Sequence, residues 1–210
     1  MWQVWRGAWR DPSFRKAVLA LVLVAIPVAF VQPVFFGHIG ARPGLFPPDP
    51  VIAHLGPMDL SPAIFLVIYG SIVLTVARVL AFPYLILRGL HAYIILLLLR
   101  MLAMWLVVLE APVDAIPLAD PVTVFFYPGG VPFLKDLFFS GHTATIALLV
   151  PLSRGPAARY AMAAATAIVA VLVVAQHVHW TVDVLAAPFF AWLAWRAGGL
   201  SLRLCGVEGG

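Results

Sequence analysis

Six long apolar segments leave few folds open to this chain. They occupy residues 17–36, 63–82, 89–109, 140–152, 157–176 and 181–197. A helix that crosses the hydrocarbon core of a bilayer needs about 20 apolar residues, a length that most of these segments approach. Only 10% of all residues are charged, whereas soluble domains carry roughly a quarter. We therefore expect an all-α fold, a polytopic membrane bundle of six transmembrane helices in one domain, residues 17–200.

The first 16 residues differ from the rest because aromatic and basic side chains are interspersed in them: Trp2, Trp5, Trp9, Arg6, Arg10 and Arg15. This composition is typical of a short amphipathic helix on the membrane surface. We predict an interfacial segment at residues 1–16 and a cytoplasmic tail at residues 201–210. No small-residue cleavage site follows the first apolar segment, so we interpret that segment as a retained transmembrane helix.

Lysine and arginine mark one side of the predicted bundle. Cytoplasmic loops are enriched in these residues, and most of the thirteen fit a single side: Arg6, Arg10, Arg15, Lys16, Arg78, Arg88, Arg154, Arg159, Arg196 and Arg203. We therefore expect an integral protein of a bacterial inner membrane with both termini cytoplasmic. Because the basic residues are scattered over helix ends and form no single stripe, nucleic acid is not expected as a partner.

Two long connections face outwards in this topology, residues 37–60 and 110–139, and both are rich in proline and glycine. Connections between the helices of a bundle usually have about 2–8 residues. Longer ones serve more often as lids or binding elements than as turns. We expect these two to cover a site, with a disordered linker as the alternative.

Two polar motifs coincide at the outer face. Ser140-Gly141-His142 begins the fourth apolar segment, and a stretch from His179 to Asp183 begins the sixth. Both segments run inwards in the predicted topology, so their starts lie at the same face. The fourth segment spans only roughly 20 Å at 1.5 Å per residue, and its start should lie below the membrane surface. The free N–H groups of a helix start favour anions, phosphate above all.

The spacing of His179 and Asp183 suits catalysis. Residues four apart share a helix face, so the carboxylate can hold the imidazole in one tautomer. The other ring nitrogen is then free to attack phosphorus as a nucleophile. His142 would protonate the leaving oxygen, a role that suits histidine because its pKa lies near the operating pH.

Two alternatives remain open at this point. His142, His177, His179 and Asp183 are all proper zinc or iron ligands. A non-catalytic membrane binding protein would also satisfy the helix pattern. The favoured interpretation uses no metal and no cofactor.

Other polar residues are candidates for holding the substrate. Arg100 lies about 16 Å outward from the start of the third segment, where an ionisable side chain should face the bundle interior and pair with Asp136 or with a substrate phosphate. The residues expected to contact substrate are Arg100, Lys135, Asp136, Ser140, Gly141 and His177.

The motifs resemble those of the type-2 phosphatidic acid phosphatase superfamily, and specifically its sphingomyelin synthase-like branch. Asp136-Leu-Phe-Phe-Ser-Gly-His142-Thr143 and His177-Val-His179-Trp-Thr-Val-Asp183-Val184 are similar to that branch's Asp-x-x-x-Ser-Gly-His-Thr and His-Glu-His-Tyr-Thr-x-Asp-Val. The resemblance covers roughly residues 100–190. It implies a six-helix bundle and metal-independent transfer through a phosphohistidine, with His179 as nucleophile, Asp183 as its partner and His142 as acid.

The chain departs from the family at informative places. The wider superfamily's Lys-x6-Arg-Pro and Ser-Arg elements have no counterpart here, and Arg100, Lys135 and Ser140 are expected to replace them. Val178 and Trp180 stand where the branch has glutamate and tyrosine, so choline is not implied as head group. The expected function is transfer of a phosphoryl head group from a phospholipid donor to a lipid alcohol. A phosphatase that uses water as acceptor is the alternative.

Overall fold

The structure is a computed structural model that describes residues 1–118, 120 and 134–207. Within this part of the chain the fold is all-α, as expected, and seven α-helices and one short 3₁₀ helix are present. The helices are α1 Trp2–Arg10, α2 Pro12–Ala41, α3 Ser61–Val79, α4 Pro83–Leu106, α6 Gly141–Leu152, α7 Pro156–Ala175 and α8 Thr181–Leu204, and the 3₁₀ helix is Ile52–His54.

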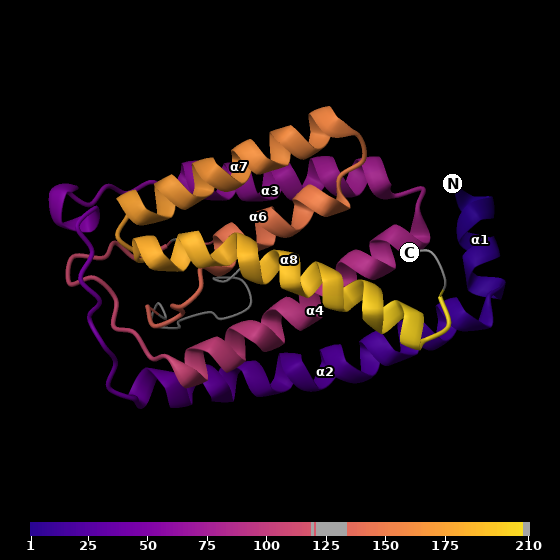
Figure 1. The fold of residues 1–210 in the computed structure, drawn as a ribbon, viewed down its shortest axis with the longest axis horizontal. Coiled ribbons are helices and arrows are strands. Elements are labelled where there is room, and N and C mark those ends of the chain that lie inside the picture. Colours follow the sequence, from indigo (N-terminus) through magenta and orange to yellow (C-terminus); the bar gives the residue numbers. More distant parts are fainter. Residues whose placement is uncertain (119, 121–133, 208–210) are drawn as a thin grey trace.

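Four helices, α2, α3, α4 and α7, are long and apolar enough to cross a membrane. Helix α6 is apolar but has only 12 residues, and α8 has 24 residues. In Figure 1 these six helices run alternately in opposite directions, and the N- and C-terminal ends of the chain lie at the same end of the bundle. We call that end the inner end, following the charge pattern, and the opposite one the outer end.

Four of the described helices have a proline in their first turn. Pro12, Pro62, Pro83 and Pro156 occupy the first or second helical position of α2, α3, α4 and α7, where the missing N–H costs nothing and the fixed φ suits the helix. Asp11 also caps α2, accepting from the Ser13 N–H at 2.9 Å. Two helices therefore begin before their expected apolar segments: α2 begins within the segment 1–16, and α4 begins six residues before Gly89. Helix α4 also ends earlier than expected, at Leu106 instead of residue 109.

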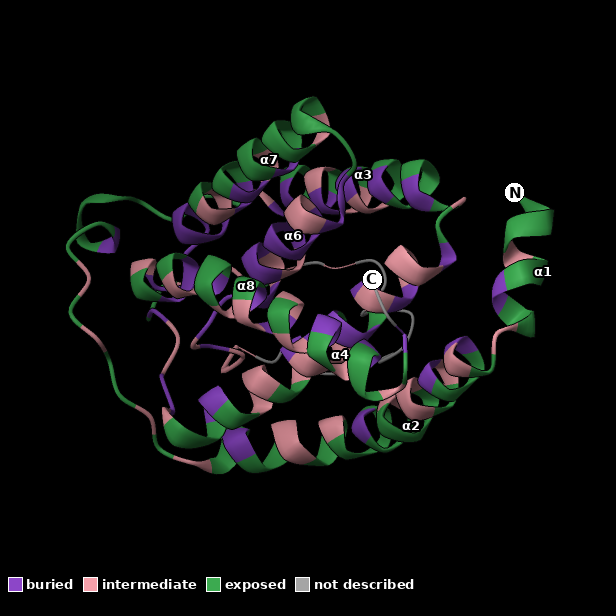
Figure 2. Ribbon diagram, turned by 45° about the vertical axis from the view of Figure 1, so that its right-hand side comes forward, coloured by how far each residue is buried: buried purple, intermediate pink, exposed green. Residues whose placement is uncertain are grey.

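Helix α6 lies in the middle of the bundle, with α3, α4, α7 and α8 around it (Figure 1). Helices α4 and α8 approach closely at Gly198 and Ala92. A Cβ added to Gly198 would lie only 2.9 Å from the Ala92 Cβ, so a larger residue would not fit there. Helix α2 lies at the edge, and its outward surface is exposed along its length (Figure 2). Only 6% of its most apolar stretch is buried, which is what a helix facing lipid requires.

The outer connections are tied to the bundle and to each other. Leu45 and Leu109 form a parallel bridge in which the Leu45 N–H donates to Val108 at 2.9 Å and the Glu110 N–H donates to Leu45 at 2.9 Å. Only glycine fits at Gly44, since a Cβ there would lie 2.7 Å from the Leu109 carbonyl carbon. The described parts of both connections thus pack over the outer end. Residues 119 and 121–133 of the second one lie outside the described part.

A buried glutamine fixes the outer end of α7. The Gln176 amide donates to Ser61 Oγ at 2.8 Å and to the Ile116 carbonyl at 3.1 Å, and it accepts from the Leu60 N–H at 2.9 Å. One side chain thereby joins α7, the start of α3 and the connection after α4. This clamp sets the position of the residues that follow it, including His177 and His179.

Candidate functional site

The start of α6 lies inside the bundle, against the first turn of α8. Ser140 is the N-cap residue; its Oγ accepts from the Thr143 N–H at 3.3 Å, and the residue is fully buried. Its own N–H donates to the Asp183 carbonyl at 3.1 Å. The structure therefore brings the two sequence motifs into direct contact.

The two histidines of these motifs face each other. The ring centroids of His142 and His179 are 5.8 Å apart with 62° between the ring planes. Phe65 of α3 packs against His142 edge-on, with 6.1 Å between the centroids. His142 Nδ1 is buried and has no hydrogen-bond partner in the described part of the chain, and His179 is only 3% exposed. The two rings are thus in direct contact, and a small group bound beside them would be within reach of both.

Asp183 positions His179. His179 Nδ1 lies 3.4 Å from Asp183 Oδ2, which also accepts from the Trp180 N–H at 3.1 Å at the start of α8. The Trp180 indole in turn donates to the Glu110 carbonyl at 2.8 Å. Asp183 is fully buried, and its Oδ1 has no partner among the residues that the structure describes. The same carboxylate therefore contributes to the start of α8 and to the orientation of the His179 ring.

Arg100 joins α4 to the start of α6. Its guanidinium forms an ion pair with Asp136 and lies directly over the Gly141 α-carbon, where a Cβ would overlap it. Burial alone would raise the pKa of Asp136, but the charge and hydrogen bond of Arg100 outweigh it, so the pKa lies below its ordinary value. A helix N-terminus and an arginine together favour an anion. Of the two partners expected for Arg100, the structure contains the acid.

Lys135 is placed differently. Its Nζ donates to Glu110 Oε1 at 2.7 Å and to the Arg42 carbonyl at 2.9 Å, both in the outer connections. This hydrogen bond lowers the pKa of Glu110. The structure thus engages Lys135 in joining the two connections, and its described contacts do not include the His142–His179 pair.

His177 forms a second pair with an acid. Its Nδ1 lies 2.8 Å from Asp114 Oδ1, and this bond lowers the pKa of Asp114. The backbone of His177 has a φ of 58°, a left-handed conformation uncommon outside glycine. Its Nε2 is buried and has no partner within the described residues. Asp114 therefore holds the His177 ring through Nδ1, while Nε2 remains available to a ligand.

Three supporting residues were not predicted: Gln176, Asp114 and Asp49. Asp49 accepts from the Thr181 N–H at 2.6 Å and from the Thr181 hydroxyl at 3.0 Å, and so caps α8 from the first outer connection. For Gln176 the sequence does carry a signal, an amide at the end of an apolar segment. The two aspartates stand in loops, where no periodic pattern indicates a partner.

In residues 1–118, 120 and 134–207, no three His, Cys, Asp or Glu side chains converge as a metal site would require. What does converge is one helix start, one arginine with its acid, and two facing histidines of which one has an acid partner. This arrangement can hold an anion and can donate or accept a proton beside it. Comparisons of the chain with protein-family models, with curated proteins and with solved structures found no match.

Proposed function

We propose that this protein is a membrane lipid phosphotransferase that moves a phosphoryl head group from a phospholipid donor to a lipid alcohol through a phosphohistidine. The observation that carries the proposal is the His142–His179 pair at the start of α6, with ring centroids 5.8 Å apart. A histidine that acts as a nucleophile needs a second group that holds the proton of one ring nitrogen and leaves the lone pair of the other free. Asp183 fills that place beside His179.

The first half-reaction forms a P–N bond and breaks a P–O bond. Asp183 holds the Nδ1 proton of His179, which leaves Nε2 with the lone pair that attacks phosphorus. The phosphate oxygens would lie at the helix start, near the N–H groups of α6 and the guanidinium of Arg100. Protonated His142 gives its proton to the leaving lipid oxygen. The products are a phosphorylated His179 and a lipid alcohol.

The second half-reaction runs the same chemistry in reverse with a new acceptor. Neutral His142 removes the proton of the incoming hydroxyl, whose oxygen attacks phosphorus while the P–N bond breaks. With a lipid alcohol the outcome is transfer, and with water it is hydrolysis. The resemblance to the sphingomyelin synthase-like branch favours transfer, and membership of the type-2 phosphatidic acid phosphatase superfamily is part of the proposal.

The proposal includes a topology. The six helices α2, α3, α4, α6, α7 and α8 would each cross the bilayer, with both termini cytoplasmic and the histidine pair near the periplasmic face of a bacterial inner membrane. The alternating helix directions and the shared end of both termini support this (Figure 1). The arginines at the inner ends of α4 and α7 agree with it.

The test is incubation of the purified protein with phospholipids labelled in the head group and with candidate lipid alcohols. Labelled new lipid is the expected product, free labelled phosphate would identify a phosphatase, and rapid acid-free quenching should trap label on His179. A matched control is His38→Ala, which alters an exposed histidine of α2. A chelator such as EDTA should leave the rate unchanged. No label transfer from any phospholipid would contradict the proposal in favour of a binding protein.

A further inference from the structure

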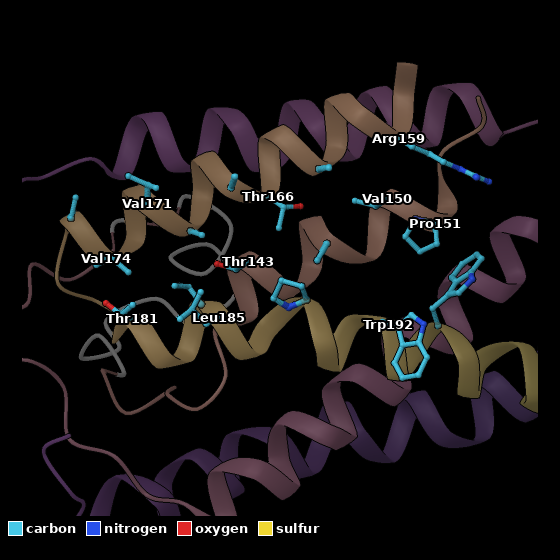
Figure 3. A pocket seen from close by; sticks show the side chains of 18 of the residues that line it. Thr143, Val150, Pro151, Arg159, Thr166, Val171, Val174, Thr181, Leu185 and Trp192 are labelled. Carbon is cyan, nitrogen blue, oxygen red and sulfur yellow. The ribbon is translucent and has the colours of Figure 1, made fainter. Parts of the chain in front are cut away.

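A long groove runs between α7 and α8 with α6 as its floor (Figure 3). Its volume is about 1410 Å³. Val171 and Val174 line it from α7, and Leu185 and Trp192 line it from α8. The side chains proposed to react, His142, His179 and Asp183, are not among its described lining residues, although its outer part reaches Thr143 and Thr181 beside them. The part of the groove near Arg159 lies at the opposite end, away from the proposed reaction centre (Figure 3).

The charge of the groove is one-sided. Nearly all of its lining is apolar, and the charged side chains on its described wall are two arginines, Arg88 and Arg159. Arg159 lies at one end of the groove and Thr181 lies at the other, outer end (Figure 3). The Arg88 guanidinium stacks over the Trp195 ring at 4.2 Å from its centroid. The inner end thus combines positive charge with aromatic rings, as the membrane interface favours.

The groove is long enough to hold an extended lipid chain. Arg159 and Ala175, which both line it, are separated by sixteen residues of α7, or about 24 Å at 1.5 Å per residue. One leaflet contributes about 15 Å, half of the hydrocarbon core of about 30 Å. The small side chains of Ala163, Ala167 and Ala170 leave space along the surface of α7, so an extended chain can lie against it.

We propose that this groove binds one anionic phospholipid of the cytoplasmic leaflet, with its phosphate on Arg159 and an acyl chain along α7 and α8. The charge of the inner end selects the occupant: a guanidinium grips a phosphate with paired donors, and anionic lipids are concentrated in the cytoplasmic leaflet. The site does not depend on the proposed catalysis. Its lipid would fill the space between α7 and α8 and hold their separation.

The experiment is native mass spectrometry of the protein after exposure to an equimolar mixture of phosphatidylglycerol and phosphatidylcholine. The wild type should retain one phosphatidylglycerol in preference to phosphatidylcholine. Arg159→Gln should reduce that preference about tenfold, the effect of losing a charge-assisted hydrogen bond. Ala167→Trp fills the groove and should abolish retention of either lipid; its fold is checked by gel filtration and circular dichroism.

A matched control tests whether any inner arginine suffices. Arg154 stands in the connection between α6 and α7, five residues before Arg159 of α7, but its guanidinium lies over the Phe82 ring at 3.7 Å from its centroid, and it does not line the groove. Arg154→Gln should leave lipid retention unchanged. Equal retention of both lipids by the wild type, or equal losses in the two arginine variants, would overturn the proposal. If Ala167→Trp does not fold, Ala163→Trp serves as the second groove-filling variant.

Discussion

Buried histidines occur at both ends of the bundle, but their ring nitrogens are satisfied differently. In the inner half, His91 has both nitrogens bonded, Nδ1 to Ser201 Oγ at 2.9 Å and Nε2 to the Ala17 carbonyl at 3.0 Å. In the outer half, His142 Nδ1 and His177 Nε2 are buried without a partner in the described chain. An unsatisfied buried nitrogen costs about 1–3 kcal/mol. His142 and His177 therefore each retain a ring nitrogen that a ligand can satisfy, whereas His91 does not.

The largest expected effect comes from the facing histidines. His179→Ala should abolish turnover because it removes the proposed nucleophile, and His142→Ala, which removes the proposed general acid, should lower turnover by about 10²–10⁴. Turnover with a labelled phospholipid is the measurement. Given a donor with a good leaving group, the His142 variant should still accumulate phosphate on His179. Full activity in the His179 variant would rule out the covalent mechanism.

The next effect concerns the arginine over the helix start. Arg100→Lys keeps the charge but loses the planar fork of donors, and Gly141→Ala places a methyl group where the guanidinium lies. Each should reduce kcat/KM by about 10², as small displacements of catalytic groups do. Arg42→Lys is the control, since Arg42 follows α2 and donates to the Trp105 carbonyl in the last turn of α4, away from the start of α6. Near wild-type rates in both site variants would show that Arg100 serves only as an ion-pair partner.

A moderate effect should separate the two kinds of buried histidine directly. His177→Asn removes a ring nitrogen for which the described residues offer no partner and should lower kcat/KM by about tenfold, the value of one hydrogen bond to a charged substrate. His91→Asn should leave kcat/KM of the folded protein unchanged but destabilise it by about 1–3 kcal/mol, because it disturbs two satisfied bonds. Kinetics and thermal unfolding are measured on both variants. The opposite pattern would reverse the assignment of the two ends.

The smallest effect is electrostatic and lies in the outer connections. Because Lys135 lowers the pKa of Glu110 in the folded protein, their pair stabilises the fold above the ordinary glutamate value of 4.5 and is lost as pH falls through the lowered value. Since both side chains are partly exposed, the contribution is at most about 1 kcal/mol. Thermal unfolding of wild type and Glu110→Gln should differ slightly at neutral pH and coincide in acid. A gap that widens in acid would contradict this assignment.

The sequence predicted the helices better than their contacts. Apolar segments identified the position of every long helix, because a membrane leaves the backbone no other way to satisfy its hydrogen bonds. The first residues of the helices were predicted less accurately. Helix α4 begins at Pro83, six residues before the apolar segment that predicts it. Proline preference at a helix start acts locally, whereas the apolar pattern averages over a window.

The same distinction holds at the site. The proximity of His142, His179 and Asp183 could be predicted, because the direction of each helix determines which helix ends lie at the same face. The partners of Lys135 and His177 could not be predicted, since Glu110 and Asp114 stand in irregular connections, 25 and 63 residues away in sequence. Contacts between loops depend on the packing of the whole fold, and no periodic pattern in the sequence predicts them.

The short length of α6 has a consequence for head-group choice. Its 12 residues cover about 18 Å, and its N-cap is bonded to a residue in the first turn of α8. A phosphate bound there must leave the plane of the surrounding head groups and shed bound water on the way down. The free energy of this dehydration increases with the polarity of the attached group. A compact or bare phosphate monoester would descend more readily than a bulky zwitterion, and depth itself would then act as a filter among lipids.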